Sequence, residues 1–298
     1  MPSSNKVRGL ARFVCIKWSV GRWKQELPIC AEKMHRIEEN MKVFFSDLDN
    51  TMIYSYRHEI GKEKICVEHY QGREVSFITK RTQELLEQAR EQMLFIPVTT
   101  RTQEQYDRID LGIGIPEYAL VCNGGVLLVE GREDRGWYET SLASIMDCQE
   151  ELRKAQHLME SDENRSFEVR NIRSLFLFTK SREPEKSVEY LAQKLDTGRV
   201  EVFQNGIKVY VVPKKLDKGT AIRRFLEAYG KEKGKDIFVM AAGDSIFDIP
   251  MLQCADLGIA PKALEDSGML PKEILVLRGG RVFSEAVLEQ ALEMGGSR

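Results

Sequence analysis

Short apolar runs alternate with segments of helical periodicity along most of this chain of 298 residues. The runs that predict buried strands are 43–45, 94–98, 118–122, 237–241, 257–260 and 274–277. Strands separated by helices lie parallel in one sheet, because a chain that returns through a helix re-enters the sheet in the same direction. The stretch 65–78 predicts an additional β-hairpin that turns at Gln71-Gly72. We therefore predict an α/β fold with a Rossmann-like parallel sheet as its core.

The pattern changes in residues 126–212, which separate the third predicted core strand from the fourth. The elements expected there are a hairpin of 126–129 with Trp137-Tyr138, helical spacing from Leu142 to Met159, a strand at 176–179, a helix opened by Pro184, and a hairpin turning at Asn205-Gly206. A segment of this length can fold as a small domain. We predict an α+β cap domain at 126–212, inserted into a core formed by 41–125 and 213–298.

Residues 1–40 differ from the rest of the chain in charge. Six basic residues precede the first acidic residue, Glu26, namely Lys6, Arg8, Arg12, Lys17, Arg22 and Lys24. This composition is typical of an organelle transit peptide, of a flexible basic arm, or of a start codon assigned too early. Met41 stands directly before the first predicted strand, which favours the last two. We interpret 1–40 as a basic extension of the fold.

The bulk composition excludes several classes of protein. The net charge of −2 provides no electrostatic footprint for nucleic acid. No apolar run approaches the ~20 residues that span a bilayer, so no membrane partner is expected. The six cysteines are scattered without a Cys-x-x-Cys pair, which argues against a zinc site and a secreted disulfide framework and indicates a reducing, cytoplasmic compartment. The sequence gives no indication of the oligomeric state.

The most informative motif follows the first predicted strand, in the run Phe44-Phe45-Ser46-Asp47-Leu48-Asp49-Asn50-Thr51. Asp47 and Asp49 are two residues apart, so both carboxylates start on the same side of an extended backbone. In open parallel sheets, ligands bind beyond the carboxyl ends of the strands. An isolated Asp-x-Asp pair is at least as often the cap of a turn or a helix. The motif needs a second feature before it indicates a site.

A second acidic pair supplies that feature. Asp244 and Asp248 follow the predicted strand 237–241, and their spacing of four residues places them on one face of a nascent helix. If neighbouring strands bring both pairs together, carboxylates converge and require either raised pKa values or a cation. A site made only of oxygen ligands favours a hard ion, and Mg²⁺ is the usual one beside phosphate. The alternative for Asp248 is a helix-start residue stabilised by the helix dipole.

Two further segments offer contacts for an anion. Thr99-Thr100-Arg101 ends the second predicted strand with hydroxyl groups and a guanidinium. Asp217 is a plausible N-cap for a helix that begins at Lys218, whose ammonium then lies near the positive end of the helix. A lysine in the first turn of a helix is usually solvated, so Lys218 by itself indicates little.

Taken in order, these elements resemble the four motifs of haloacid dehalogenase superfamily phosphatases. The motifs are Asp-x-Asp-x-Thr beginning at Asp47, a strand-end Thr at Thr99, a Lys at Lys218, and Gly-Asp-x-x-x-Asp beginning at Gly243. The insert resembles the C2-type cap of the subgroup that includes Cof-type phosphatases, sucrose-phosphate phosphatase and phosphomannomutase. The resemblance covers roughly residues 41–290. Its first and last motifs are specific at this separation, whereas the isolated Thr and Lys are not.

The resemblance implies a Mg²⁺-dependent phosphomonoester hydrolase that works through an aspartyl-phosphate. Asp47 would be the nucleophile, and Asp49 would protonate the leaving oxygen and later activate water. Thr51 would orient Asp49. The implied metal ligands are Asp47, the backbone carbonyl of Asp49, Asp244 and the supporting Asp248, and the implied phosphate-binding residues are Thr99 and Lys218.

Three positions depart from the family pattern. Asn50 stands where Gly is common, and Asn also tolerates left-handed backbone geometry. Thr100 replaces the Gly of Thr-Gly-Arg, which leaves open whether Thr99 or Thr100 contacts phosphate. Phe247 replaces an Asn that often supports the metal, so the metal site of this protein is expected to differ.

The resemblance implies a phosphorylated sugar or a similar small metabolite as the substrate. Basic residues of the insert that could meet a second anionic group are Arg170, Arg173, Lys180 and Lys208. Two alternatives stay open: a phosphomutase of the same fold, which returns the phosphoryl group to its substrate, and a non-catalytic protein that binds a phosphorylated ligand.

Overall fold

The computed structural model describes residues 41–229 and 237–296. The predicted basic extension, 1–40, lies outside the described residues. Among the described residues, no helix has both the length and the apolar character needed to cross a membrane.

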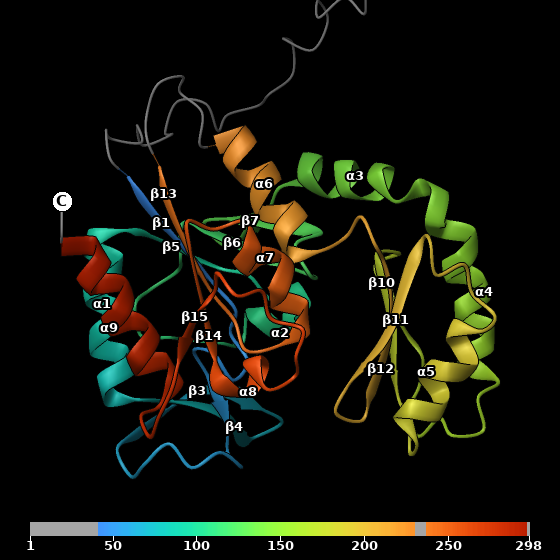
Figure 1. Ribbon diagram of the computed structural model, residues 1–298, viewed down its shortest axis with the longest axis horizontal. Coiled ribbons are helices and arrows are strands. Elements are labelled where there is room, and N and C mark those ends of the chain that lie inside the picture. The colour runs from blue at the N-terminus through green and yellow to red at the C-terminus, as the bar shows by residue number, and fades with distance from the viewer. Residues whose placement is uncertain (1–40, 230–236, 297–298) are drawn as a thin grey trace, which may run out of the picture. The chain divides into compact units, whose positions relative to one another are not determined.

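The core of the fold is a sheet of five parallel strands, drawn in Figure 1. Its order is β15-β14-β13-β1-β5, and its strands are β1 (Lys42–Ser46), β5 (Leu94–Pro97), β13 (Phe238–Ala242), β14 (Leu257–Pro261) and β15 (Leu275–Leu277). In this register Ser46 lies opposite Ala242 on one side and Pro97 on the other. The predicted α/β class is confirmed, and residues that follow β1, β5 and β13 share one edge of the sheet.

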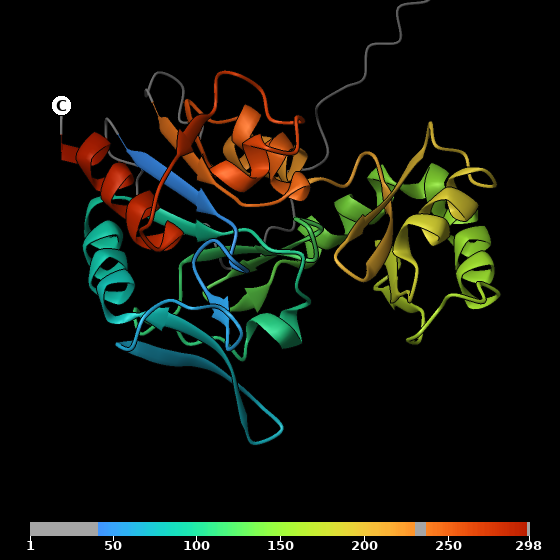
Figure 2. The same ribbon diagram turned by 60° about the horizontal axis from the view of Figure 1, so that its bottom comes forward.

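Helices cover both faces of this sheet, because alternate residues of the buried strands point to opposite faces. Phe44 of β1 belongs to an apolar cluster with residues of α1 (Lys80–Gln92) and α9 (Phe283–Gly296). The next residue, Phe45, belongs to a cluster with residues of α6 (Lys218–Tyr229) and α7 (Ile249–Gln253). Figures 1 and 2 show α1 and α9 side by side.

A small antiparallel sheet follows β1 in the chain. It has the order β2-β4-β3 and contains β2 (Tyr54–Ser55), β3 (Lys64–Tyr70) and β4 (Arg73–Thr79). Gln71 and Gly72 have φ values of 51° and 74°, the left-handed geometry of a tight hairpin turn. The predicted hairpin and its turn are therefore confirmed.

The segment after β5 departs from two predictions. Residues 118–122, predicted as a third core strand, form β6 (Tyr118–Val121), which lies beside β5 but is joined to it by a single parallel bridge between Val98 and Leu120 and not by a full ladder. β6 pairs instead with β7 (Val126–Val129) and, through it, with β8 (Arg132–Glu133). The turn residues Cys122 and Asn123 have positive φ and send the chain back along β6.

The predicted hairpin of 126–129 with Trp137-Tyr138 is wrong, because Trp137 and Tyr138 lie in α3 (Arg135–Ser144). The carboxylate of Asp134 accepts a hydrogen bond from the amide of Trp137 at 2.9 Å and so caps this helix. The indole nitrogen of Trp137 donates to the carbonyl of Gly124 at 3.0 Å. The N-cap residue Asp134 favours a helix for this segment, and the alternation of apolar residues, which suggested a strand, does not reveal that cap.

The rest of the insert is an antiparallel sheet with helices on one face. Its order is β11-β12-β10-β9, with β9 (Arg170–Ile172), β10 (Phe176–Lys180), β11 (Val200–Asn205) and β12 (Lys208–Pro213). Residues Leu177 and Val211 share an apolar cluster with α4 (Gln149–Glu160) and α5 (Pro184–Ala192). The remaining short elements are α2 (Gln103–Tyr106), η1 (Met146–Cys148), η2 (Ile246–Asp248) and α8 (Lys262–Glu265).

Candidate active site

Three carboxylates meet at the carboxyl edge of the core sheet. Asp47 follows β1 directly and Asp244 follows β13, the strand that pairs with β1 in register. The amide of Asp47 donates to the carbonyl of Ala242 at 2.9 Å, which continues the ladder to the carboxyl edge of the sheet. Carboxylate oxygens of Asp47, Asp244 and Asp248 lie within 4.8 Å of one another. The parallel pairing of two strands that are distant in the sequence therefore creates the cluster.

The ammonium of Lys218 lies inside this cluster. The side chain is only 1% exposed, and Nζ donates to Oδ1 of Asp47 at 2.5 Å and to Oδ1 of Asp248 at 2.6 Å. Lys218 is the first residue of α6, whose start is capped by Asp217 through a bond of 2.8 Å from the amide of Thr220. A buried ammonium is strongly unfavourable without such partners, so Lys218 belongs to the site and not to the solvated surface.

Asp248 has two roles in the geometry. One oxygen faces Lys218, and the other accepts hydrogen bonds from the amide of Ser245 at 2.9 Å, its hydroxyl at 2.8 Å and the amide of Asp244 at 3.1 Å. The hydrogen bonds between Ser245 and Asp248 form a capping box at the start of η2. Both interpretations of Asp248, a helix-start residue and a member of the cluster, hold at once. Its carboxylate fixes the loop that carries Asp244.

The electrostatics of the cluster show an excess of negative charge. Burial raises the pKa of Asp47, and the charges of Asp248 and Asp244 add to this effect while Lys218 opposes it. Burial and the neighbouring Asp248 likewise raise the pKa of Asp244, to about 7, against the opposing hydrogen bond from Thr51. Burial would lower the pKa of Lys218, but Asp248 and Asp47 outweigh it and raise that pKa. A single buried cation does not neutralise three carboxylates.

The cluster fits a small, hard divalent cation. Mg²⁺ prefers oxygen ligands at about 2.0–2.1 Å in octahedral geometry, which separates pairs of ligand atoms by roughly 2.9–4.1 Å. The ligand atoms of the three carboxylates lie within 4.8 Å of one another, and the raised pKa values of Asp47 and Asp244 indicate charge that a dication would relieve. The hydroxyl of Thr51 donates to Oδ1 of Asp244 at 3.1 Å and holds one of these oxygens in place.

Asp49 lies apart from the cluster and is paired with Arg101. The guanidinium contacts both carboxylate oxygens, with distances of 2.8 Å from Nε to Oδ2 and 2.7 Å from the terminal nitrogen to Oδ1. Burial would raise the pKa of Asp49, but the hydrogen bonds and charge of Arg101 outweigh it and lower that pKa. A group that delivers a proton at neutral pH needs the opposite shift. In this geometry Asp49 is an ionised partner of Arg101.

Glu68, on β3, was not singled out by the sequence. Its carboxylate is 1% exposed and contacts Arg101 at 2.9 Å, Arg108 at 3.0 Å and the hydroxyl of Ser76 at 2.6 Å. Burial would raise the pKa of Glu68, and the Ser76 and arginine contacts outweigh it and lower that pKa. The signal for such a residue is an acidic side chain within an apolar strand. Glu68 is ion-paired with the guanidinium of Arg101, which is in turn ion-paired with Asp49.

The two threonines after β5 differ in their surroundings. Thr99 is fully buried, and its hydroxyl oxygen accepts a hydrogen bond from the amide of Arg101 at 3.2 Å. Within the described part of the chain, no hydrogen bond joins the Thr99 side chain to the carboxylate cluster or to Lys218. Thr100 lines the cavity beside Asp49. The choice between them as a phosphate contact therefore stays a prediction.

A cavity of about 410 Å³ adjoins Asp49 and is lined by Arg101, Arg108 and residues of the insert, Phe178, Lys208 and Tyr210 among them. Of the four basic residues of the insert that the sequence suggested, Lys208 alone lines it. The others are engaged elsewhere, Arg170 with Glu168, Arg173 with Glu133, and Lys180 over the ring of Phe167. This cavity has the position and size for the leaving group of a small substrate.

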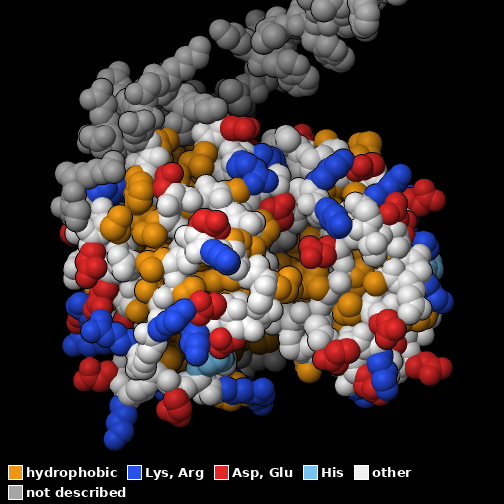
Figure 3. Space-filling view, in the orientation of Figure 1, with side chains coloured by type: hydrophobic (Ala, Val, Ile, Leu, Met, Phe, Trp, Pro, Cys, Tyr) orange, Lys and Arg blue, Asp and Glu red, His pale blue; other side chains and the backbone are white. Residues whose placement is uncertain are grey.

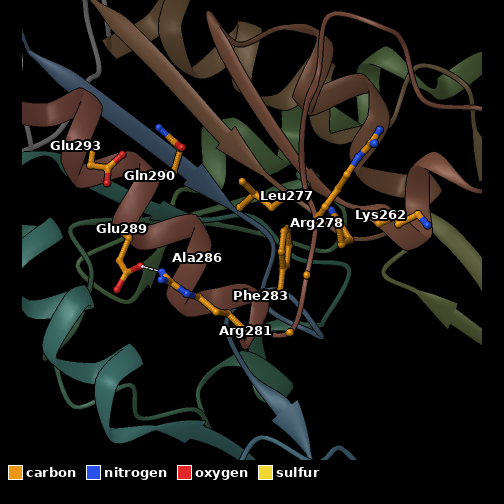
Figure 4. A pocket seen from close by; sticks show the side chains of 12 residues that line it. Lys262, Leu277, Arg278, Arg281, Phe283, Ala286, Glu289, Gln290 and Glu293 are labelled. Carbon is orange, nitrogen blue, oxygen red and sulfur yellow. Dashed lines mark hydrogen bonds and ion pairs between the residues drawn. The ribbon is translucent and has the colours of Figure 1, made fainter.

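A second cavity, of about 580 Å³, lies along α9 (Figure 4), and within the described residues no group of three metal-binding side chains lines it. Two of its arginines are paired, Arg278 with Glu265 and Arg281 with Glu289. In the face seen in Figure 3, acidic and basic side chains are interspersed and no large patch of one sign forms. Neither feature competes with the acidic cluster as a reaction site.

Comparison with known proteins agrees with this geometry. A sequence model of the family described as haloacid dehalogenase-like hydrolase matches residues 127–263. The chain is 29% identical, over 175 residues (56% of this chain and 71% of the relative), to a protein of Methanopyrus kandleri named phosphoglycolate phosphatase. The sucrose-phosphatase of Synechocystis sp. PCC6803 aligns with a TM-score of 0.59 and 15% identity over 87% of this chain and 98% of that chain.

A protein of Thermoplasma acidophilum aligns with a TM-score of 0.55 and 13% identity over 86% of this chain and 98% of that chain. At such identities the structural likeness shows the fold. The family match covers part of the chain, residues 127–263, and the four sequence motifs run in the order seen in the resemblance. Over residues 127–263, this chain is similar to the haloacid dehalogenase-like hydrolases.

Proposed function

We propose that this enzyme is a Mg²⁺-dependent phosphomonoester hydrolase that acts on a phosphorylated sugar or a similar small metabolite through an aspartyl-phosphate. The observation that carries the proposal is the ammonium of Lys218, buried between Asp47 and Asp248 beside the carboxylate of Asp244. Such a set of charges suits a phosphoryl group and a dication. The names of two relatives, a phosphoglycolate phosphatase and a sucrose-phosphatase, support the substrate class.

In the proposed reaction, a carboxylate oxygen of Asp47 attacks phosphorus while Lys218 and Thr99 bind the transferring phosphoryl oxygens. Lys218 already contacts Oδ1 of Asp47, so the nucleophile and a phosphate ligand are held in one place. Mg²⁺, held by Asp47, the backbone carbonyl of Asp49 and Asp244 with Asp248 in support, would neutralise the developing negative charge. Positioning and charge neutralisation then supply most of the catalysis.

Asp49 would give a proton to the leaving oxygen as the phosphorus–oxygen bond breaks. It would then take a proton from the water that attacks the aspartyl-phosphate and releases inorganic phosphate. Both steps require Asp49 to be free of Arg101, because that ion pair lowers its pKa. A substrate that enters the adjoining cavity would compete for the guanidinium of Arg101 and so release Asp49.

We further propose that residues 41–125 and 213–298 form the catalytic core and that 126–212 form a cap. The separate sheet β11-β12-β10-β9 supports this division. The hairpin of β6 and β7, however, crosses the proposed boundary between residues 125 and 126. The cap residues Phe178, Lys208 and Tyr210 line the cavity beside Asp49, which would let the cap select the leaving group. A cytoplasmic location stays a prediction.

A phosphate-release screen over phosphorylated metabolites, with Mg²⁺ present, tests the proposal. The wild-type protein is expected to release phosphate, and Asp47→Asn is expected to lower kcat by about 10³-fold or more, as for the loss of other catalytic nucleophiles. Asp266→Asn is the matched control, since Asp266 is exposed and lies outside the cluster. Full activity in Asp47→Asn would refute the nucleophile.

The same screen separates the two alternatives. A phosphomutase would isomerise a sugar phosphate and release little phosphate, although Asp47→Asn would still stop it. A non-catalytic protein would bind a phosphorylated ligand with Mg²⁺ and turn over no compound of the panel. Either result would replace the hydrolase proposal.

A further inference from the structure

Three side chains with metal-binding donors gather on one side of the hairpin formed by β3 and β4. They are Cys66 and His69 on β3 and Glu74 on β4, and one ligand atom of each lies within 4.8 Å of the others. Cys66 is half-buried, while His69 and Glu74 are exposed. The group is accessible to an ion from solvent and is separate from the Asp47 cluster.

An irregularity in the hairpin brings these side chains together. Residues three apart on a regular strand point to opposite faces, so Cys66 and His69 would ordinarily be separated by the sheet. The register shifts between Cys66 and Glu68, and again between Glu68 and His69. Beyond these shifts His69 lies directly opposite Glu74. β-Bulges of this kind re-aim side chains and are common beside functional sites.

The distance between Cys66 and His69 matches that of two ligands in a tetrahedral zinc site. Sγ of Cys66 lies 3.7 Å from Nε2 and 3.8 Å from Nδ1 of His69. Zinc–sulfur and zinc–nitrogen bonds of about 2.3 and 2.0–2.1 Å at a tetrahedral angle place these two ligand atoms roughly 3.6 Å apart. We propose that Cys66, His69 and Glu74 form a site for Zn²⁺ or a similar borderline divalent ion, with water as its fourth ligand.

The surroundings leave these donors available. Among the described residues, no hydrogen bond or ion pair engages the carboxylate of Glu74, and the ring nitrogens of His69 contact only Cys66. The thiol of Cys66 donates to the carbonyl of Glu68 at 3.3 Å. Binding would release the thiol proton to solvent and replace this hydrogen bond with a metal–thiolate bond.

The donor set distinguishes this site from the acidic cluster. A thiolate, an imidazole and a carboxylate suit zinc and its neighbours, whereas Mg²⁺ prefers oxygen alone. An ion bound here would link β3 to β4. Its ligands on β3 would lie before and after Glu68, the residue that is ion-paired with Arg101. The proposed site does not depend on the proposed phosphatase activity.

Titration of reduced, metal-free, full-length protein with Co²⁺ tests the site, because Co²⁺ substitutes for zinc and reports thiolate ligation in its absorption spectrum. Excess Mg²⁺ keeps the acidic cluster occupied. We expect one equivalent of Co²⁺ to produce a thiolate-to-metal charge-transfer band. Cys66→Ser is expected to abolish the band. His69→Gln, at an exposed position, is expected to lower the Co²⁺ affinity by at least ~10-fold, because even residues that only hydrogen-bond to a metal ligand contribute that much.

Other cysteines provide the controls. Cys254→Ser removes the other half-buried described thiol, and the pair Cys15→Ser with Cys30→Ser removes two that lie outside the described residues. Both controls should keep the band. A band that survives in Cys66→Ser, a band lost in either control, or the lack of any band in the folded wild type would overturn the proposal, whatever the outcome of the phosphate-release screen.

Discussion

Lys218 and Asp244 behave differently in this fold than they would in water. The ammonium of Lys218 is 1% exposed and is stabilised by two carboxylates, so it acts as a fixed charge. Asp244 sits among other acidic groups, and its pKa rises to about 7. These two residues show how burial and neighbouring charges change the pKa of ordinary side chains.

The raised pKa of Asp244 predicts how the stability of the metal-free protein changes with pH. The folded state holds the Asp244 proton up to about pH 7, while the unfolded state releases it near 3.8. Between these values the folded state binds more protons, so the free energy of unfolding is expected to fall as pH rises, by about 1.4 kcal/mol per pH unit for one such group. Urea unfolding in EDTA at several pH values measures the slope.

Asp244→Asn is the control for this prediction. The variant cannot ionise, so its stability should depend less on pH across the same window than that of the wild type. Mg²⁺ should stabilise the wild type more at pH 8 than at pH 5, because the metal binds the ionised carboxylates. Identical slopes for the two proteins would contradict the raised pKa.

At the scale of elements, the site depends on the close approach of α6 and α7. Gly219 follows Lys218 in α6, and a Cβ added there would lie 2.3 Å from the carbonyl oxygen of Pro250 in α7. This close approach lets α6 bring Lys218 to the ends of β1 and β13. The glycine is therefore required by packing and not by backbone conformation.

Gly219→Ala is expected to destabilise the protein by about 1–3 kcal/mol, the usual cost of overpacking, and to lower kcat because Lys218 moves with its helix. Thermal unfolding and the phosphate-release assay measure the two effects. Gly280→Ala is the matched control, because its added Cβ meets open space. Equal stability of both variants and the wild type would show that α6 and α7 are not in close contact.

At the scale of the whole molecule, Phe247 joins the loop that carries Asp244 to the insert. Its ring packs edge-on against Phe203 and Tyr210, with centroids 4.5 and 5.1 Å away. Phe247 lies beside Asp248 in η2, whereas the other two rings belong to β11 and β12. The departure from the family pattern at position 247 thus has a structural consequence, an aromatic contact with the insert.

A double-mutant cycle measures this contact. Phe247→Ala and Phe203→Ala should each reduce stability, and the pair should show a coupling energy of about 0.5–1.5 kcal/mol, typical of aromatic pairs. Phe77→Ala combined with Phe247→Ala is the control, since Phe77 lies in a different apolar cluster. Additive effects of Phe247→Ala and Phe203→Ala would mean that the two rings do not meet in solution.

Local patterns in the sequence determined the class of the fold and the location of the acidic cluster. Strand and helix periodicity depends on neighbouring residues, so the parallel core and the hairpin turn at Gln71-Gly72 could be predicted from the sequence, and the turn predicted at Asn205-Gly206 lies one residue later, at Gly206-Ile207. The acidic residues stand at the ends of strands, and parallel strands end at a common edge. That argument needed no knowledge of packing.

Tertiary structure alone decided which side chains meet. Lys218 and Asp47 are 171 residues apart, and the pairing of Asp49 with Arg101 depends on Glu68 from a third element. Trp137 lies in a helix because of a cap and a distant carbonyl, and an irregular register aims Cys66 and His69 to one side. Contacts between distant segments leave no periodic signal in the sequence, because each depends on packing that forms only when the whole core assembles.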